Sequence, residues 1–178
     1  MTTVIYDPRS EVGVPVNDYK LSLDVKAPGL VIGLVSNGFP DAENLLVAVG
    51  RALATVLDEP EVRIFARNDP SVVAHESVVG EVVSQCDAVV TAMGHCGSCT
   101  SSTVRDAVTF AGRGLPTVGL VTAKFWESGS FVARSVGMPE VPRVMLPYPV
   151  AGTGLANIAR IADEAVIQIV RRLGGAGE

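Results

Sequence analysis

The sequence has little of what marks secreted, membrane-spanning or nucleic-acid-binding proteins. Its three cysteines are too few, and odd in number, for the disulfide framework of a secreted domain. No segment approaches the ~18 to 20 uninterrupted apolar residues of a membrane span. The 14 basic residues are scattered and the net charge is −5, so no basic face is offered to nucleic acid. No signal peptide opens the sequence, and we therefore expect a cytoplasmic protein with reduced thiols.

Apolar residues make up 48% of the 178 residues, which is enough for one globular domain with a sizeable core. Residues 1–28 differ from the rest because Asp, Asn, Pro and Gly interrupt short apolar pieces that are too broken for a long helix. We interpret 1–28 as an extended N-terminal arm that covers the domain's own edge or reaches a neighbouring subunit. Residues 29–178 are expected to form a single α/β domain, apolar enough to favour a homo-oligomer.

From Leu30 onward, short runs of Val, Ile and Leu alternate with longer amphipathic stretches, as in βαβ units around a buried parallel sheet. The pattern predicts strands over 30–35, 61–66, 88–93, 116–121 and 143–146. It predicts a helix after each strand: one carrying Leu45 to Val56, one over 71–85, one carrying Val104 to Ala111 and ending at Gly112, one over 125–136 and one over 155–173. Right-handed crossovers give a three-layer α/β sandwich with a five-stranded parallel sheet, flavodoxin-like or Rossmann-like in order.

The cysteine pair Cys96 and Cys99 follows the third predicted strand, at the edge of the sheet where such folds bind ligands. A thiolate is the reactive form of cysteine, and unpaired N–H groups at a helix N-terminus favour it. His95 is expected to supply further positive charge or to take a proton. Cys96 is then the attacking thiol, and Cys99 resolves the mixed disulfide or sulfenic acid that forms on it.

Polar residues and glycines in the loops at the same edge are expected to hold a small-molecule substrate. Asn37 is expected to point its amide into the crevice, and Thr100, Ser101 and Ser102 are competent helix caps whose hydroxyls can contact a carbonyl or carboxylate. The loop 147–154 can present backbone N–H groups to an anion, but it lacks the Lys of a P-loop and the GxGxxG fingerprint, so we expect no cofactor. The predicted substrate-binding residues are Asn37, Gly38, Gly94, Ser98, Thr100, Ser101, Thr122, Gly152 and Thr153.

Three simpler interpretations stand beside the reactive thiol. The cysteines can bind a structural zinc, although a tetrahedral site needs four ligands and only His95, His75 and Cys86 remain, so we expect no metal. They can also be small buried side chains without reactivity. The loops around Asn37 and Gly152 can be plain turns. Cys86, at the end of the second predicted helix, is interpreted as core packing.

Several segments together resemble one known family. They are 31–38, Pro40-Asp41-Ala42, 86–92 and above all Cys96-Gly97-Ser98-Cys99-Thr100-Ser101, with further agreement at 114–118, 137–139 and 147–149. These segments resemble the UGSC family, which takes its name from a selenocysteine-Gly-Ser-Cys motif and has cysteine at the first position in many members. The resemblance covers nearly the whole chain from about Leu30. It implies that Cys96 occupies the selenocysteine position and does redox or nucleophilic work, with Cys99 as its partner.

The leading hypothesis is an enzyme of small-molecule metabolism in which Cys96 and Cys99 carry out a thiol-dependent redox step. Its rival within enzymology keeps Cys96 as a covalent nucleophile or acid/base group of a lyase, dehydratase or hydrolase, with His95 moving protons and no net redox change. A hypothesis of another class is a non-catalytic binding domain, or a subunit of a two-component enzyme that shares its site with a related chain.

Overall fold

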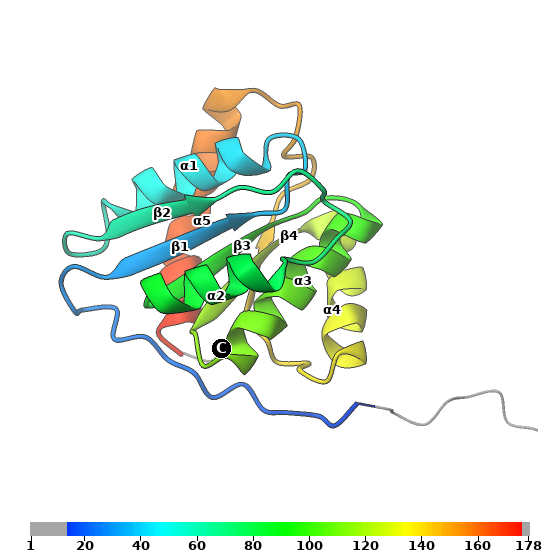
Figure 1. Cartoon of the computed structure of the whole chain (residues 1–178). Coiled ribbons are helices and arrows are strands. Elements are labelled where there is room, and N and C mark those ends of the chain that lie inside the picture. The colour runs from blue at the N-terminus through cyan, green and yellow to red at the C-terminus, as the bar shows by residue number, and fades with distance from the viewer. Residues whose placement is uncertain (1–13, 176–178) are drawn as a thin grey trace, which may run out of the picture.

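The computed structural model describes residues 14–175, so the first thirteen residues of the expected arm lie outside the described part. Five strands form one parallel sheet in the order β2-β1-β3-β4-β5, the flavodoxin order (Figure 1). The strands are β1 (Val31–Ser36), β2 (Glu61–Phe65), β3 (Ala88–Gly94), β4 (Thr117–Thr122) and β5 (Arg143–Leu146). The expected α/β class with a five-stranded parallel sheet is confirmed.

Helices cover both faces of the sheet and make the three layers (Figure 1). On one face, α1 (Ala42–Leu53) and α5 (Leu155–Leu173) pack on each other and on the sheet through a continuous cluster of buried Leu, Ile, Val and Ala. On the other face lie α2 (Glu76–Gln85), α3 (Gly97–Gly112) and α4 (Trp126–Ser135), the last preceded by a short 3-10 turn, Ala123–Phe125. The reversal between β1 and β3 is where a crevice at the carboxyl ends is expected.

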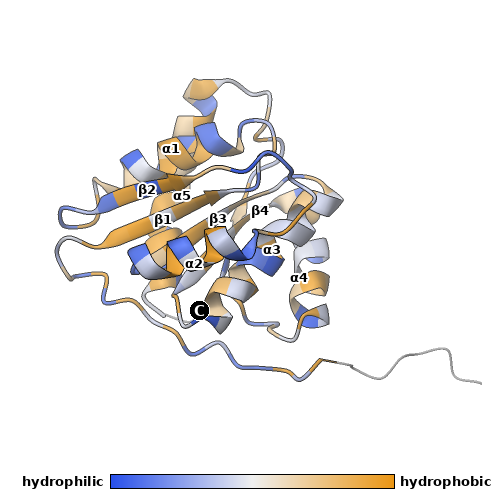
Figure 2. Cartoon of the chain, viewed as in Figure 1, coloured by the Kyte–Doolittle hydropathy of each residue, from blue (hydrophilic) through white to orange (hydrophobic). Residues whose placement is uncertain are grey.

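The hydropathy of the strands explains the position of the core. Every residue of β3 and β4 is buried, since both strands lie inside the sheet under helices on both faces. The edge strand β2 is exposed or half-buried throughout, and it carries charged side chains at Glu61 and Arg63. Figure 2 shows this gradient from apolar central strands to more polar outer elements. The apolar runs of the sequence therefore sit where two helical layers exclude water.

The strand boundaries agree with the sequence prediction to within about one residue. Among the helices, α1 ends at Leu53, short of the expected Val56, and α2 begins later than expected. The helix predicted over 71–85 was wrong in its first part, because it begins only at Glu76, with His75 in extended backbone as its N-cap. The preceding segment is held against α3 instead: the Ser102 hydroxyl donates to the Pro70 carbonyl at 2.6 Å, and the Ala74 N–H donates to Asp106 at 2.7 Å. Tertiary bonds therefore replace a helical turn there.

The described part of the arm, 14–28, lies against its own domain (Figure 1). The Asn17 N–H donates to the Gly137 carbonyl at 2.7 Å and the Leu23 N–H to the Leu173 carbonyl at 2.8 Å. The Tyr19 hydroxyl accepts from the Thr117 N–H at 3.0 Å, at the start of β4. The arm thus crosses the amino-terminal end of the sheet, opposite to the cysteines.

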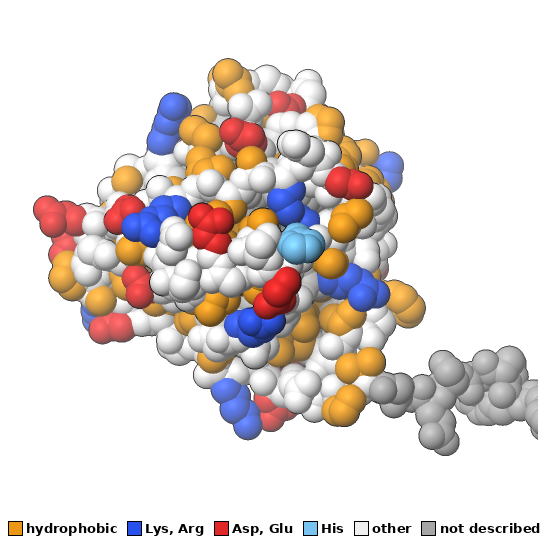
Figure 3. Space-filling model, in the orientation of Figure 1, with side chains coloured by type: hydrophobic (Ala, Val, Ile, Leu, Met, Phe, Trp, Pro, Cys, Tyr) orange, Lys and Arg blue, Asp and Glu red, His pale blue; other side chains and the backbone are white. Residues whose placement is uncertain are grey.

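The outer surface carries charges of both signs. Figure 3 shows acidic and basic side chains interspersed on the face that it displays, without a field of one sign. Within 14–175, no helix combines the length and the apolar composition that crossing a membrane requires.

Candidate active site

The two cysteines lie where β3 gives way to α3, at the carboxyl end of the sheet. Cys96 is the N-cap of α3, with extended backbone at φ −140° and ψ 176°, and the helix begins at the next residue. Cys99 lies in the first turn. The expectation that Thr100, Ser101 or Ser102 caps this helix was wrong, because the helix starts earlier and all three residues lie within it.

Cys96 and Cys99 are joined by a disulfide, with their Cα atoms 5.2 Å apart. The Cys99 backbone N–H donates to the Cys96 Sγ at 3.2 Å. The N-cap acceptor of α3 is therefore a sulfur, where most helices have a side-chain oxygen. The Cys96 side chain is partly exposed, whereas Cys99 is only 1% exposed. Of the two sulfurs, that of Cys96 is therefore the more accessible from solvent.

His95 does not supply positive charge to Cys96, contrary to the sequence-based expectation. Its Nε2 atom faces two backbone donors, the N–H of Val150 at 3.0 Å and that of Ala151 at 3.3 Å, and it must be unprotonated to accept from them. Burial, with a smaller contribution from Lys124, lowers the pKa of His95. The ring is therefore neutral at pH 7 and ties the cysteine loop to the loop after β5.

Two aromatic rings flank the His95 imidazole. The Phe39 ring stacks on it with the centroids 5.1 Å apart, and the Tyr148 ring lies tilted against it with the centroids 4.8 Å apart. The Lys124 ammonium lies 4.8 Å from the centre of the Tyr148 ring, close enough for a cation–π contact. Loops after β1, β3, β4 and β5 are thus packed together around one histidine.

Asn37 points into the protein and not into the crevice, so the expectation for its amide was wrong. Its Nδ2 group donates to the carbonyls of Met93 at 3.0 Å and Cys99 at 3.4 Å and to the Thr103 hydroxyl at 3.2 Å. Its Oδ1 atom accepts from the Phe39 N–H at 3.1 Å. At 1% exposure the amide is fully engaged, and it holds the first turn of α3 against β1.

Thr122 and Thr100 are also used inside the protein. The Thr122 hydroxyl donates to the Gly94 carbonyl at 2.8 Å, and the Thr100 hydroxyl donates to the Cys96 carbonyl at 2.6 Å. Neither side chain is exposed, so the expected contacts with a substrate are not available to them. A Cβ at Gly94 would lie 3.0 Å from the Thr100 hydroxyl, which explains why this tight path takes a glycine.

Ser98 and Ser101 remain near the surface beside the disulfide. The Ser98 hydroxyl lies 3.5 Å from the Cys96 Sγ, and Ser98 is exposed. Ser101 is half-buried and accepts from the Arg105 guanidinium at 3.3 Å. Of the predicted substrate-binding hydroxyls, that of Ser98 is the one placed to meet a molecule at Cys96.

The loop after β5 does not offer its backbone to an anion as expected. The Gly152 N–H donates to the Asp41 carboxylate at 2.8 Å, and the Thr153 hydroxyl donates to the Val150 carbonyl at 2.6 Å. With the carboxylate of Asp41 beside it, this backbone would repel a phosphate. The loop is tied to the start of α1 instead.

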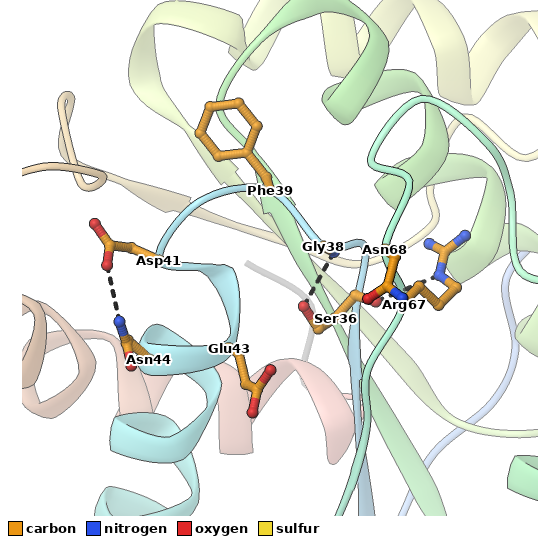
Figure 4. A pocket seen from close by; sticks show the side chains of 8 residues that line it. All are labelled: Ser36, Gly38, Phe39, Asp41, Glu43, Asn44, Arg67 and Asn68. Atoms are coloured by element: carbon orange, nitrogen blue, oxygen red, sulfur yellow. Dashed lines mark hydrogen bonds between the residues drawn. The ribbon is translucent and has the colours of Figure 1, made fainter.

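A pocket of about 390 Å³ opens on the other side of the Asn37 turn, between the start of α1 and the loop after β2. Figure 4 shows Ser36 and Asn68 near its centre, Glu43 and Asn44 on the side of α1, and the Arg67 guanidinium on the side away from that helix. Gly38 is in its wall at φ +82°, and a Cβ there would lie 2.2 Å from the Arg67 carbonyl oxygen. The expected residue Gly38 is thus part of a cavity.

Sequence reasoning missed the buried ion pair between Arg67 and Asp106, whose side chains are 11% and 2% exposed. Burial raises the pKa of Asp106 to about 6, while Arg67 and the Ala74 N–H act in the opposite direction. A signal was present, because Asp106 lies beside the apolar residues Val104 and Ala107 in the predicted helix. A carboxylate on a buried helical stripe needs a partner in the fold.

Cys86 ends α2 in a buried position, and burial raises the pKa of its thiol to about 11. Among residues 14–175, no group of three or more His, Cys, Asp or Glu is arranged to hold a metal ion.

Comparison with known proteins gives one family and a small number of similar structures. The model of the UGSC family matches residues 4–175. A crystal structure of diflavin flavoprotein A3 from Nostoc sp. is similar at 15% identity and a TM-score of 0.42, covering 83% of this chain and 95% of that one. Smu.1420 from Streptococcus mutans UA159 is similar at 13% identity and a TM-score of 0.36, covering 76% and 100%. No curated protein matches the sequence.

Proposed function

The chain belongs to the UGSC family, and from that premise we propose that it is an enzyme of small-molecule metabolism that works by thiol–disulfide exchange. Cys96 is the attacking thiolate and Cys99 the resolving thiol. One observation carries the proposal: the partly exposed member of the pair, Cys96, caps α3 with its sulfur, and the sulfur of its buried partner Cys99 is bonded to it. An N-cap position favours the thiolate because the N–H groups there carry partial positive charge.

The proposed reaction reduces a small-molecule disulfide. The Cys96 thiolate attacks one sulfur of the substrate, the substrate S–S bond breaks, and the departing thiolate takes a proton from water. Cys99 loses its proton and attacks the Cys96 Sγ, which releases the second substrate thiolate and forms the protein disulfide. The substrate gains two electrons from the protein and two protons, one from water and one given up by Cys99. An external dithiol reductant returns the pair to the reduced state.

The other side chains of the site act as positioning residues in this proposal. Asn37 fixes the first turn of α3 through the Cys99 carbonyl, and His95 fixes the neighbouring loop through two backbone N–H groups. Ser98 is the hydroxyl nearest to the reacting sulfur. Rigid support of this kind keeps the two sulfurs at a distance where exchange is fast.

The test is mass spectrometry of the reduced protein after exposure to cystamine, a small disulfide. Wild type is expected to finish with the Cys96–Cys99 disulfide and two equivalents of free cysteamine. Cys99→Ser is expected to stop at a mixed disulfide on Cys96, and Cys96→Ser to remain unmodified. Cys86→Ala, which also removes one thiol, serves as the control and should behave as wild type.

A mixed disulfide on Cys99 in Cys96→Ser, or no mixed disulfide on Cys96 in Cys99→Ser, would overturn the proposal. Full turnover by Cys99→Ser with a substrate that undergoes no redox change would instead support the lyase, dehydratase or hydrolase alternative. The homo-oligomer, or a complex with a related subunit, stays a prediction, and light scattering after size-exclusion chromatography measures it.

A further inference from the structure

The ligand that the pocket beside the Asn37 turn favours depends on which polar groups in its wall are already hydrogen-bonded or ion-paired within the protein. We propose that it binds a primary amine that carries an oxygen on the neighbouring carbon, as in a 2-amino alcohol, and that it excludes carboxylates and phosphates. Its volume of about 390 Å³ lies in the range of small-molecule sites.

The guanidinium of Arg67, the positively charged group in the pocket wall, makes its hydrogen bonds within the protein. Arg67 donates from Nη2 to Asp106, from Nη1 to the Val72 carbonyl at 2.5 Å and from Nε to the Ser36 carbonyl at 3.3 Å. The side chain of Asp106 is only 2% exposed, so this pair is closed to solvent. Arg67 therefore does not attract an anion into the pocket as a free guanidinium would.

The carboxylates of Glu43 and Asp41 in the wall have no such ion pair within the described residues. Glu43 has no ion-pair or hydrogen-bond partner within 14–175, and Asp41 has no ion pair there. Asp41 accepts from the Gly152 N–H and from the Asn44 amide, both at 2.8 Å, and these two bonds lower its pKa. Two carboxylates in a wall that also holds Phe39 favour an ammonium group.

A buried hydroxyl group in the pocket wall indicates the second polar group of the ligand, an oxygen. Ser36 lines the pocket at 1% exposure, and its oxygen accepts from the Gly38 N–H at 3.1 Å. Its proton has no acceptor among the residues of 14–175. A buried donor without an acceptor is costly, and a ligand oxygen beside the ammonium would satisfy it. Figure 4 shows Ser36 and Glu43 among the side chains that line the pocket.

The pocket is connected to the thiol site through one short turn. Phe39 lines the pocket and stacks on His95, which precedes Cys96, while Asn37 donates to the Cys99 carbonyl. The turn in the pocket wall thus also holds the cysteine loop in place. That this ligand is the substrate rests on the proposed function, whereas binding in the pocket does not.

The test is titration of isotope-labelled full-length protein, followed by backbone amide NMR, with three two-carbon probes that differ in charge. They are ethanolamine, ethylene glycol and glycolate, at pH 7 and constant ionic strength. Ethanolamine is expected to shift the amide signals of Gly38, Glu43 and Asn68 to saturation, with a Kd about tenfold below that of ethylene glycol, because an ammonium–carboxylate bond is added. Glycolate should leave these signals unmoved.

Matched variants separate the pocket from general attraction to an acidic protein. Glu43→Gln is expected to raise the Kd for ethanolamine about tenfold. Glu81→Gln removes one exposed carboxylate from α2, away from the pocket, and should leave the Kd unchanged. Equal effects of the two variants, saturable binding of glycolate, or ethanolamine shifts outside the pocket would each overturn the proposal.

The same titration on Cys96→Ser distinguishes this proposal from that of thiol exchange. Binding of ethanolamine should persist unchanged in that variant, because Cys96 does not line the pocket. Cystamine exchange without ethanolamine binding would reject the pocket ligand alone. Binding without exchange would reject the thiol reaction and leave the pocket assignment standing.

Discussion

The backbone N–H of Cys99 points at the Sγ atom of Cys96 across 3.2 Å, at the first turn of α3. No basic side chain is needed for this contact, because the helix itself provides the donor. The neighbouring imidazole of His95 is neutral and accepts from the backbone N–H groups of Val150 and Ala151, so it does not supply a positive charge to the sulfur. The reactivity of the pair is thus expected to come from helix geometry.

The first prediction is that the Cys96 thiol of the reduced protein has a pKa well below the ~8.5 of a free cysteine. The N–H groups at the start of α3 stabilise its thiolate, and Cys99 is buried and receives no such help. The rate of alkylation by iodoacetamide as a function of pH measures this in Cys99→Ser. Cys96→Ser is the matched control and should react slowly at every pH below 8. Equal rates for both variants would contradict the prediction.

The second prediction concerns His95 as an acceptor. His95→Phe keeps a ring between Phe39 and Tyr148 but leaves the N–H groups of Val150 and Ala151 without their acceptor. We expect a loss of about 1–3 kcal/mol of unfolding free energy at pH 8, the usual cost of unsatisfied buried donors. Urea unfolding followed by circular dichroism measures it.

The pH dependence of that loss tests the neutral form. The pKa of His95 is lowered in the folded protein from its ordinary 6.5, so the unfolded chain binds more protons between the two values. The stability that the neutral ring contributes is present above 6.5 and is lost as the pH falls through the lowered pKa. The difference between wild type and His95→Phe should therefore shrink in acid. A difference that grows in acid would show that the charged ring is the stabilising form.

The fold could be predicted because the sequence patterns that indicate its strands and helices are local and repeated. Apolar runs such as 88–93 separated by amphipathic helices have few arrangements other than a parallel sheet with two helical layers. The position of the cysteines at the carboxyl edge followed from the same pattern. The segment 71–75 failed because its partners, Asp106 and Ser102, are about 30 residues away along the chain and leave no mark on its own periodicity.

The place of the cysteine loop in the fold was predicted, but the contacts of the polar residues around it were not. Asn37, Thr100 and Thr122 were expected to meet a substrate because polar residues in such loops often do. In the structure each is buried and bonded to a backbone carbonyl. Whether a hydroxyl or amide faces a ligand or a carbonyl depends on the packing of neighbouring loops, which the spacing of residues does not encode.

The third prediction separates steric conflict from backbone strain in the wall of the pocket. Gly38→Ala places a Cβ 2.2 Å from the Arg67 carbonyl oxygen at a φ of +82°, so the loop after β2 must move. Gly152→Ala has a similar φ of +76° but meets nothing within 4 Å. We expect a loss of about 1 kcal/mol for Gly152→Ala and at least about 2 kcal/mol more for Gly38→Ala. Equal losses in urea unfolding would show that the contact relaxes freely.

The fourth prediction concerns Arg67 as the partner of a buried carboxylate. Arg67→Met keeps most of the side-chain volume but leaves Asp106 without its cation, and we expect a loss of about 3–5 kcal/mol at pH 7. Arg113→Met breaks the exposed pair with Glu76, whose side chains are 47% and 67% exposed, and should cost at most about 1 kcal/mol. Urea unfolding of both variants gives the comparison. Similar losses would mean that the Arg67 pair is as weak as a surface pair.

The last prediction follows from the raised pKa of Asp106. Its carboxyl titrates at about 6 in the folded protein and at 3.8 in the unfolded chain, so between these values the folded protein binds more protons. The contribution of this group to stability is therefore fully present below 3.8 and is lost as the pH rises through about 6. Asp106→Asn keeps an acceptor for the Ala74 N–H but does not titrate. The unfolding free energy of wild type relative to Asp106→Asn should thus fall between pH 4 and pH 7, by an amount on the order of 3 kcal/mol for a shift of about two pKa units. A flat difference over that range would mean that Arg67 fully offsets the burial of the carboxylate, and would place the titration of Asp106 back near its ordinary value.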